Sequence, residues 1–191
     1  MKIFHGSPAY RYAIDARAAD CREDMALWAQ SAGHEWVRAT ESRPEVSWAR
    51  NVIVAQAIEA RADLLIMQDA DSWTKTPALP ALLETMAATG AAVVSPVFRA
   101  RSGQGYCVQP QIPGERYEVD IVGAALLFID LVSLRDMPRP WFTFRYGPEG
   151  QVLEREDTGF CRMVRGHGRR VLADWTISTC HKGEALHEAG A

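Results

Sequence analysis

An apolar run of strand length, residues 64–67 (LLIM), leads directly into the polar edge 68–71 (QDAD). A continuous run of this kind is typical of a strand that helices cover on both faces, as in parallel sheets. Apolar runs and helical periods alternate through the first half of the chain. Strands are predicted at residues 2–5, 34–39, 63–68 and 91–97, and helices at 16–32, 47–61 and 78–90. This alternation predicts an α/β fold built on a mostly parallel sheet.

The second half of the chain has a different pattern. Residues 99–116 are rich in Gly, Pro, Gln and Arg, and their length favours a functional loop or an irregular hairpin. No repeat or linker interrupts the chain, so we predict one domain over residues 1–183. A frayed C-terminal tail is predicted over residues 184–191. The elements expected in this half are an extended apolar segment at 119–129, a helix at 156–166 and a strand at 170–175.

The composition excludes several classes of protein. The 191 residues are 48% hydrophobic and 24% charged, which is typical of a soluble globular domain. No apolar run reaches the roughly 18 residues of a membrane span, and the N-terminus has no signal-peptide pattern. The net charge of -3 gives no general attraction to nucleic acid or membranes. The four cysteines form no C-x-x-C pair, so we expect reduced thiols in a cytoplasmic protein.

Two carboxylates stand at the end of the LLIM strand. Asp69 and Asp71 are one residue apart, so both side chains can leave the strand toward the same side. Ligands of such sheets bind outside the carboxyl ends of the strands, where the helix at 47–61 contributes Arg50 and backbone N–H groups. Two carboxylates there favour a hard oxygen site for Mg²⁺ or Mn²⁺. The alternative is a solvated turn in which Asp71 caps the segment that follows.

A second acidic signal supports this site. Glu156 and Asp157 open the predicted helix at 156–166, and the strand after that helix leads to His181. A helix packed antiparallel to the next strand brings these side chains to the same edge of the sheet. An imidazole among carboxylates shifts the metal preference toward Mn²⁺. The alternatives are simple stabilisation of a helix N-terminus by the acidic pair and a surface position for the histidine.

Five motifs occur along the chain, namely R-N at 50–51, D-A-D at 69–71, V-G-A at 122–124, E-D-T-x-F-C at 156–161 and C-H-K-G at 180–183. In this order, over residues 1–183, they resemble the GT-A glycosyltransferases, particularly family 2-like enzymes of small bacterial or phage type. The resemblance implies the GT-A fold of nucleotide-diphospho-sugar transferases, a Rossmann-like three-layer α/β/α sandwich. Gly159 departs from the family pattern, in which a larger residue is common.

The resemblance also implies catalytic roles. Asp71 would bind Mn²⁺, or Mg²⁺, on the donor diphosphate, with His181 as the second protein ligand. Asp69 would hydrogen-bond the ribose or the donor sugar. Asp157, or else Glu156, would be the general base that deprotonates the acceptor hydroxyl. A single displacement of this kind predicts inversion at the anomeric carbon.

The resemblance also implies which residues bind the nucleotide sugar. UDP is the favoured nucleotide because of its prevalence among Mn²⁺-dependent D-x-D enzymes. Arg50 would reach the nucleotide, and Gly123 would leave room for the sugar. The base pocket would lie after the first and second strands, at Ser7, Pro8, Tyr10 and Thr40.

The acceptor and the competing functions stay open. A saccharide, a protein side chain or a hydroxylated base in DNA would fit, the last through a basic rim at Arg99, Arg101, Arg139 and Arg145. The alternatives are a catalytically inactive GT-A-like nucleotide-binding protein and a metal-dependent phosphohydrolase or nuclease. Trp28, Trp48 and Phe160 are expected in the core. The positions at which aromatic rings fit either the core or an acceptor site are Trp73, Trp141, Phe142 and Tyr146.

Overall fold

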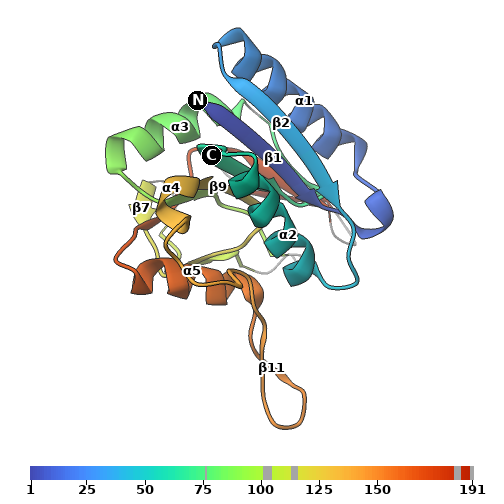
Figure 1. Ribbon diagram of the computed structural model, residues 1–191, viewed down its shortest axis with the longest axis vertical. Helices are drawn as coiled ribbons and strands as arrows, with labels where there is room; N and C mark the ends of the chain where they lie inside the picture. Colours follow the sequence, from blue (N-terminus) through green and yellow to red (C-terminus); the bar gives the residue numbers. More distant parts are fainter. Residues whose placement is uncertain (76, 101–104, 113–115, 183–185, 190–191) are drawn as a thin grey trace.

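The computed structural model describes residues 1–75, 77–100, 105–112, 116–182 and 186–189, the last of these ranges by its backbone alone. Within these ranges, seven strands form a central sheet (Figure 1). In this sheet β9 and β7 run against the other strands, so the mostly parallel sheet predicted from the sequence is confirmed. The spatial order is β2 (Glu35–Glu41), β1 (Lys2–Pro8), β3 (Leu64–Gln68), β9 (Leu126–Asp130), β5 (Val93–Pro96), β12 (Val171–Asp174) and β7 (Arg116–Glu118).

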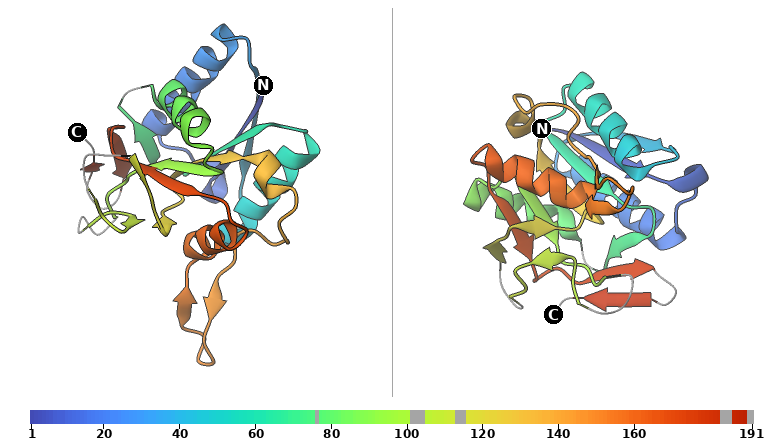
Figure 2. Two further views of the ribbon diagram at one scale, coloured as in Figure 1. Left: turned by 90° about the vertical axis from the view of Figure 1, so that its left-hand side faces the viewer. Right: turned by 90° about the horizontal axis from the view of Figure 1, so that it is seen from below.

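Helices cover both faces of this sheet (Figures 1 and 2). One layer contains α1 (Ala16–Ser31) and α3 (Ala78–Thr89), and the other contains α2 (Val46–Glu59), α4 (Leu131–Leu134) and α5 (Glu156–Gly166). The LLIM strand shows why both layers are needed. Leu64 and Ile66 join the core under α1 and α3, whereas Leu65 and Met67 join the core under α2 and α5. The fold is therefore the predicted three-layer α/β/α sandwich.

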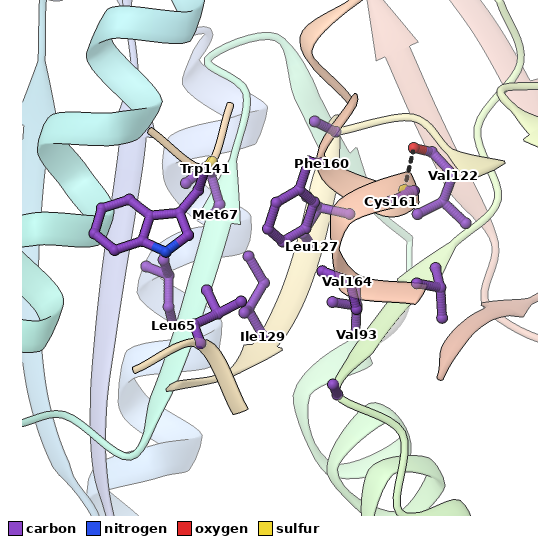
Figure 3. Close-up of a cluster of buried hydrophobic side chains, with 14 of the residues drawn as sticks. Leu65, Met67, Val93, Val122, Leu127, Ile129, Trp141, Phe160, Cys161 and Val164 are labelled. Carbon is purple, nitrogen blue, oxygen red and sulfur yellow. Dashed lines mark hydrogen bonds between the residues drawn. The ribbon is translucent and has the colours of Figure 1, made fainter. Parts of the chain in front are cut away.

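Aromatic rings fill the core between the sheet and α5 (Figure 3). Phe160 is fully buried, as the sequence predicts, and Phe142 stacks on it with the ring centroids 4.3 Å apart. Trp141 and Trp73 are also buried. Of the four rings that the sequence left open between core and ligand, these three belong to the core, because apolar area is buried most effectively there.

The face of α2 that meets the sheet differs from the prediction. Gly6 on β1 lies so close to the helix that an added Cβ would stand 2.1 Å from Cγ2 of Ile53. Ile53 thus lies on the face of α2 that packs on the sheet. Trp48, five residues earlier, lies on another face and is 53% exposed, although the sequence places it in the core. Ser47 lies buried in the first turn, and the residue at the N-cap is Glu45.

Short strands surround the carboxyl edge of the sheet. β4 (Ser72–Thr74) and β14 (Leu186–Ala189) both pair with β13 (Thr179–Lys182). The predicted frayed tail is thus wrong for residues 186–189, which pair with the preceding strand β13. The extended segment predicted at 119–129 is divided into β8 (Ile121–Val122), which pairs with β6 (Val108–Gln109), and β9. Of the predicted loop at 99–116, residues 101–104, with Arg101 among them, and 113–115 lie outside the described residues.

A hairpin of β10 (Arg145–Tyr146) and β11 (Val152–Glu154) projects from the body of the molecule and leads into α5 (Figure 1). A short 3₁₀ helix, η1 (Tyr10–Tyr12), follows β1 at the carboxyl edge. Within the described ranges, every helix is too short or too polar to cross a bilayer.

Candidate functional site

An open cleft lies at the carboxyl edge of the central sheet, next to the N-termini of α2 and α5. Its volume of about 760 Å³ is within the range of small-molecule sites. Arg50 comes to its wall from α2, Asp69 from the end of β3, and His181 from β13. Glu156 and Asp157 reach it from the first turn of α5. Residues that the sequence predicts from four separate segments therefore border one cleft, at the edge where α/β sheets bind ligands.

Arg50 is a buried cation between two carboxylates. It is 3% exposed, and its guanidinium donates hydrogen bonds to Asp69 Oδ1 at 2.7 Å and to Glu156 Oε1. Burial lowers the pKa of Arg50, but the two carboxylates outweigh this effect and raise that pKa above its ordinary value. A buried charge is tolerated only when it is paired. Arg50 thus fixes the positions of both acids, and its contact with a nucleotide stays a prediction.

The two carboxylates that open α5 have different surroundings. Glu156 is buried, and burial raises its pKa although Arg50 opposes the rise. Asp157 is partly exposed in the wall of the cleft and accepts a hydrogen bond from the backbone N–H of Thr158 at 2.8 Å. A molecule in the cleft can therefore reach Asp157, whereas Glu156 is held by Arg50.

A second hollow of about 510 Å³ adjoins the cleft, and Val46 and Asp69 line both. Asp71 lines this hollow, and its Oδ1 lies 3.5 Å from Nε2 of His181. A carboxylate oxygen beside an imidazole nitrogen is a donor pair that suits Mn²⁺. Across the part of the chain that the structure describes, no group of three or more Asp, Glu, His or Cys residues could hold an ion. A metal between Asp71 and His181 stays a prediction.

The four residues predicted to hold the nucleotide base are divided between this hollow and the sheet. Pro8 and Tyr10 line the hollow, and Tyr10 is 70% exposed. Ser7 is buried in β1 and is paired in register with Thr40 of β2. The structure therefore brings Pro8 and Tyr10 to a cavity and leaves Ser7 and Thr40 in the sheet.

Gly123 lines the cleft, and the reason for its lack of a side chain is close packing. A Cβ at this position would stand 2.6 Å from Cβ of Cys107, and the Gly123 N–H donates to the Cys107 carbonyl at 2.7 Å. Real Cβ atoms do not approach so closely. Gly123 therefore allows β8 to approach the segment before β6, and its predicted contact with a sugar stays a prediction.

Asn51 has a positional role that the sequence did not reveal. Its Oδ1 accepts hydrogen bonds from the backbone N–H groups of Trp141 at 2.9 Å and Phe142 at 3.1 Å. Its Nδ2 donates to the carbonyls of Phe142 at 2.7 Å and Ser47 at 2.9 Å. One amide thus ties the aromatic segment to the start of α2. The signal in the sequence was an Asn inside an apolar helix. Such a residue indicates a buried polar contact but does not show which residue is its partner.

Asp15 and Lys182 close one side of the second hollow, and the sequence predicted neither. Lys182 Nζ donates to Asp15 Oδ2 at 2.8 Å, and this bond lowers the pKa of Asp15. Asp15 also caps α1, because its Oδ1 accepts from the backbone N–H of Arg17 at 3.0 Å. The ion pair therefore joins β13 to the start of α1.

The chain matches no protein-family model and no curated protein. Among solved structures it is similar to A197 from STIV, with a TM-score of 0.67, 20% identity, and coverage of 95% of this chain and 86% of that one. It is also similar to S. aureus TarS, with a TM-score of 0.57, 13% identity, and coverage of 100% of this chain and 37% of that one. TarS 1–349 in complex with UDP-GlcNAc gives a TM-score of 0.52 at 11% identity, over 98% of this chain and 58% of that one. These likenesses establish the fold, and the chain spans much less than the whole of TarS.

Proposed function

We propose that this protein is a metal-dependent glycosyltransferase that moves a sugar from a UDP-sugar to an acceptor hydroxyl with inversion. The observation that carries the proposal is the arrangement of the acidic residues and His181 around two adjoining cavities. Asp157 stands in the cleft, the Asp71–His181 pair stands where cleft and hollow meet, and Asp69 borders both. A donor nucleotide in the hollow would then present its sugar to the cleft. The similar fold of TarS, which was solved with UDP-GlcNAc, supports the choice of UDP.

Asp71 and His181 fit the protein share of a Mn²⁺ site. One supplies a carboxylate oxygen and the other an imidazole nitrogen, and the short distance between them allows both to bind one ion. With two protein ligands, most of the coordination sphere is left to diphosphate oxygens and water. When bound, the ion stabilises the charge that develops on the leaving diphosphate.

The remaining chemistry belongs to the acids that open α5. Asp157 is the carboxylate within reach of the cleft, so we assign it as the general base that takes the proton from the acceptor hydroxyl. Arg50 neutralises Glu156 and fixes it, which leaves Glu156 unsuited to that role. Arg50 also orients Asp69, which would hydrogen-bond the ribose or the donor sugar. Attack from the side of Asp157 in one displacement inverts the anomeric carbon.

A thermal-shift panel with UDP, GDP, TDP and CDP tests the donor site, each nucleotide with Mn²⁺, with Mg²⁺ and with EDTA. A ligand at 100 times its Kd adds about 2.7 kcal/mol, and a chain of this size gains roughly 2–4 °C per kcal/mol. We expect a shift of about 5–10 °C with UDP and Mn²⁺, which EDTA and Asp71→Ala abolish. Asp20→Asn, an exposed substitution on α1, is the matched control. Flat curves with every nucleotide would refute the proposal.

Product analysis separates the competing functions. With UDP-GlcNAc, a transferase releases UDP, and Asp157→Asn reduces that release without removing the UDP shift. Release of inorganic phosphate or cleavage of nucleic acid would instead identify a phosphohydrolase or a nuclease. A UDP shift with no product from any UDP-sugar would identify an inactive nucleotide-binding protein.

A further inference from the structure

A groove next to the cleft has features that the donor site does not use. It has a volume of about 460 Å³ and lies between the first turn of α2 and the segment leading into β10. Trp48 and Tyr146 line it, and each is 53% exposed. Phe144 stacks on Tyr146 with the ring centroids 5.9 Å apart and an interplanar angle of 29°. Glu45 adds a carboxylate that accepts a hydrogen bond from the Tyr146 hydroxyl at 3.4 Å. Large exposed rings gathered around one groove are uncommon on a soluble surface and mark binding sites.

The groove adjoins the cleft whose wall includes Asp157. Phe144 lines both cavities, so a molecule seated on the rings can extend past Phe144 into the cleft. The two cavities are also linked along the chain. Tyr146 of the groove belongs to the projecting hairpin, whose second strand, β11, ends only three residues before Asp157. A ligand of this groove therefore lies next to the cleft that contains the carboxylate assigned as the base.

Buried contacts fix the floor of the groove. Asn51 binds the backbone at Trp141 and Phe142 through its side-chain amide. Helix α5 packs closely on the next residue, since a Cβ at Gly159 would stand 3.1 Å from the Thr143 carbonyl. This contact accounts for the glycine at a position where the family resemblance leads one to expect a larger residue. A surface held in this way is preformed, and binding to it loses little conformational entropy.

The chemistry of the groove indicates a neutral saccharide. Sugar rings present C–H faces that pack on aromatic rings, and hydroxyl groups that donate hydrogen bonds to a carboxylate such as that of Glu45. A nucleic acid would instead need cations available for phosphates. The arginines around the groove already have partners within the chain. Arg145 and Arg162 pair with Glu154. Arg43 pairs with Glu41 and lies over the Trp48 ring, 5.3 Å from its centroid, and Arg139 lies over the Trp141 ring.

We propose that this groove is the acceptor subsite and that the acceptor is a neutral oligosaccharide stacked on Trp48 and Tyr146, an inference that rests on the proposed glycosyltransferase function. The rings hold the saccharide so that one hydroxyl reaches Asp157. The acceptor and the nucleotide occupy different cavities, so the side chains that bind one ligand are not those that bind the other.

Saturation-transfer NMR on the full chain tests the subsite, with cellotetraose, chitotetraose, maltotetraose and laminaritetraose as probes. A duplex containing 5-hydroxymethylcytosine is the competing probe. We expect at least one tetrasaccharide to bind. Trp48→Ala and Tyr146→Ala should each weaken its binding about tenfold, which corresponds to roughly 1.4 kcal/mol. Leu27→Ala, at a somewhat more exposed position on α1, should leave the binding unchanged. Because all three side chains are exposed, the variants should fold, and their melting temperatures verify this.

The possible results are distinguishable. Failure of every tetrasaccharide to bind overturns the inference, as does equal binding by Trp48→Ala and the unmodified chain. Binding of the duplex alone, weakened steeply by salt, overturns it in favour of a DNA acceptor. If UDP with Mn²⁺ stabilises the protein while these results are negative, the acceptor inference fails and the proposed function stands. If UDP gives no stabilisation, the proposed function fails first.

Discussion

Replacing Arg50 by Met should be among the most damaging single substitutions near the cleft. The side chains of Arg50 and Glu156 are 4% and 9% exposed, so the change leaves a carboxylate buried without its cation. Removing one partner of a buried ion pair costs about 3–5 kcal/mol, because the remaining charge has lost its hydration and its partner. For a chain of this size that corresponds to a fall of roughly 6–20 °C in the melting temperature.

The loss should depend on pH in a defined direction. Burial already raises the pKa of Glu156 above the 4.5 of the unfolded chain, and removal of Arg50 raises it further. A carboxyl group with a raised folded-state pKa contributes its full stability below the unfolded value and loses it as the pH rises through the folded value. The Arg50→Met chain should therefore be destabilised less at pH 5 than at pH 8.

Urea unfolding at pH 5 and pH 8, followed by tryptophan fluorescence, measures both effects. Adding Glu156→Gln to Arg50→Met should restore part of the stability, because it removes the orphaned charge. Arg38→Met is the matched control, since Arg38 pairs with Glu23 at the surface and its loss should cost less than about 1 kcal/mol. Equal losses for Arg50→Met and Arg38→Met, or a loss that is constant between the two pH values, would refute the reasoning.

Three further predictions concern packing, a buried histidine and a helix cap. Gly123→Ala should lower the free energy of unfolding by about 1–3 kcal/mol, because the new Cβ overlaps Cys107. In urea titrations, adding Cys107→Gly should recover part of this loss. If the effects of the two substitutions simply add, the contact is contradicted. Burial lowers the pKa of His5 to about 3, so its ring should stay neutral in ¹⁵N NMR spectra from pH 8 down to pH 5. The stability that the neutral ring contributes above pH 6.5 should be lost as the pH falls. A ring that titrates near pH 6.5 would contradict this. Asp15→Ala should destabilise the chain by about 1 kcal/mol through loss of the α1 cap. Lys182→Met, which removes only the ion pair with Asp15, should destabilise it by less. Thermal melts measure both effects, and the reverse order would contradict the role of the cap.

The sequence predicted the elements whose information is local. The helix at 156–166 begins and ends where predicted, because acidic residues favour its first turn and its apolar period is regular. The LLIM strand was also predicted correctly, since a short run of consecutive apolar residues is typical of a strand covered on both faces. Because ligands of such sheets bind at the carboxyl ends of the strands, the sequence also predicts that Asp69, Glu156, Asp157 and His181 lie together, and all four border one cleft.

The misjudged parts depend on contacts that an element's own residues do not show. The face of α2 that meets the sheet carries Ile53, which packs against Gly6 of β1, and Trp48 lies on another face, at the groove. Strand β14 pairs with the preceding strand β13, and residues 186–189 do not signal this pairing by themselves. The sequence thus determined the α/β layering and which residue types reach the carboxyl edge, because apolar periodicity and the alternation of strands and helices along the chain are local features. Only the tertiary structure decided that Arg50 joins acids 19 and 106 residues away, because a buried charge takes whichever partners the fold brings within reach.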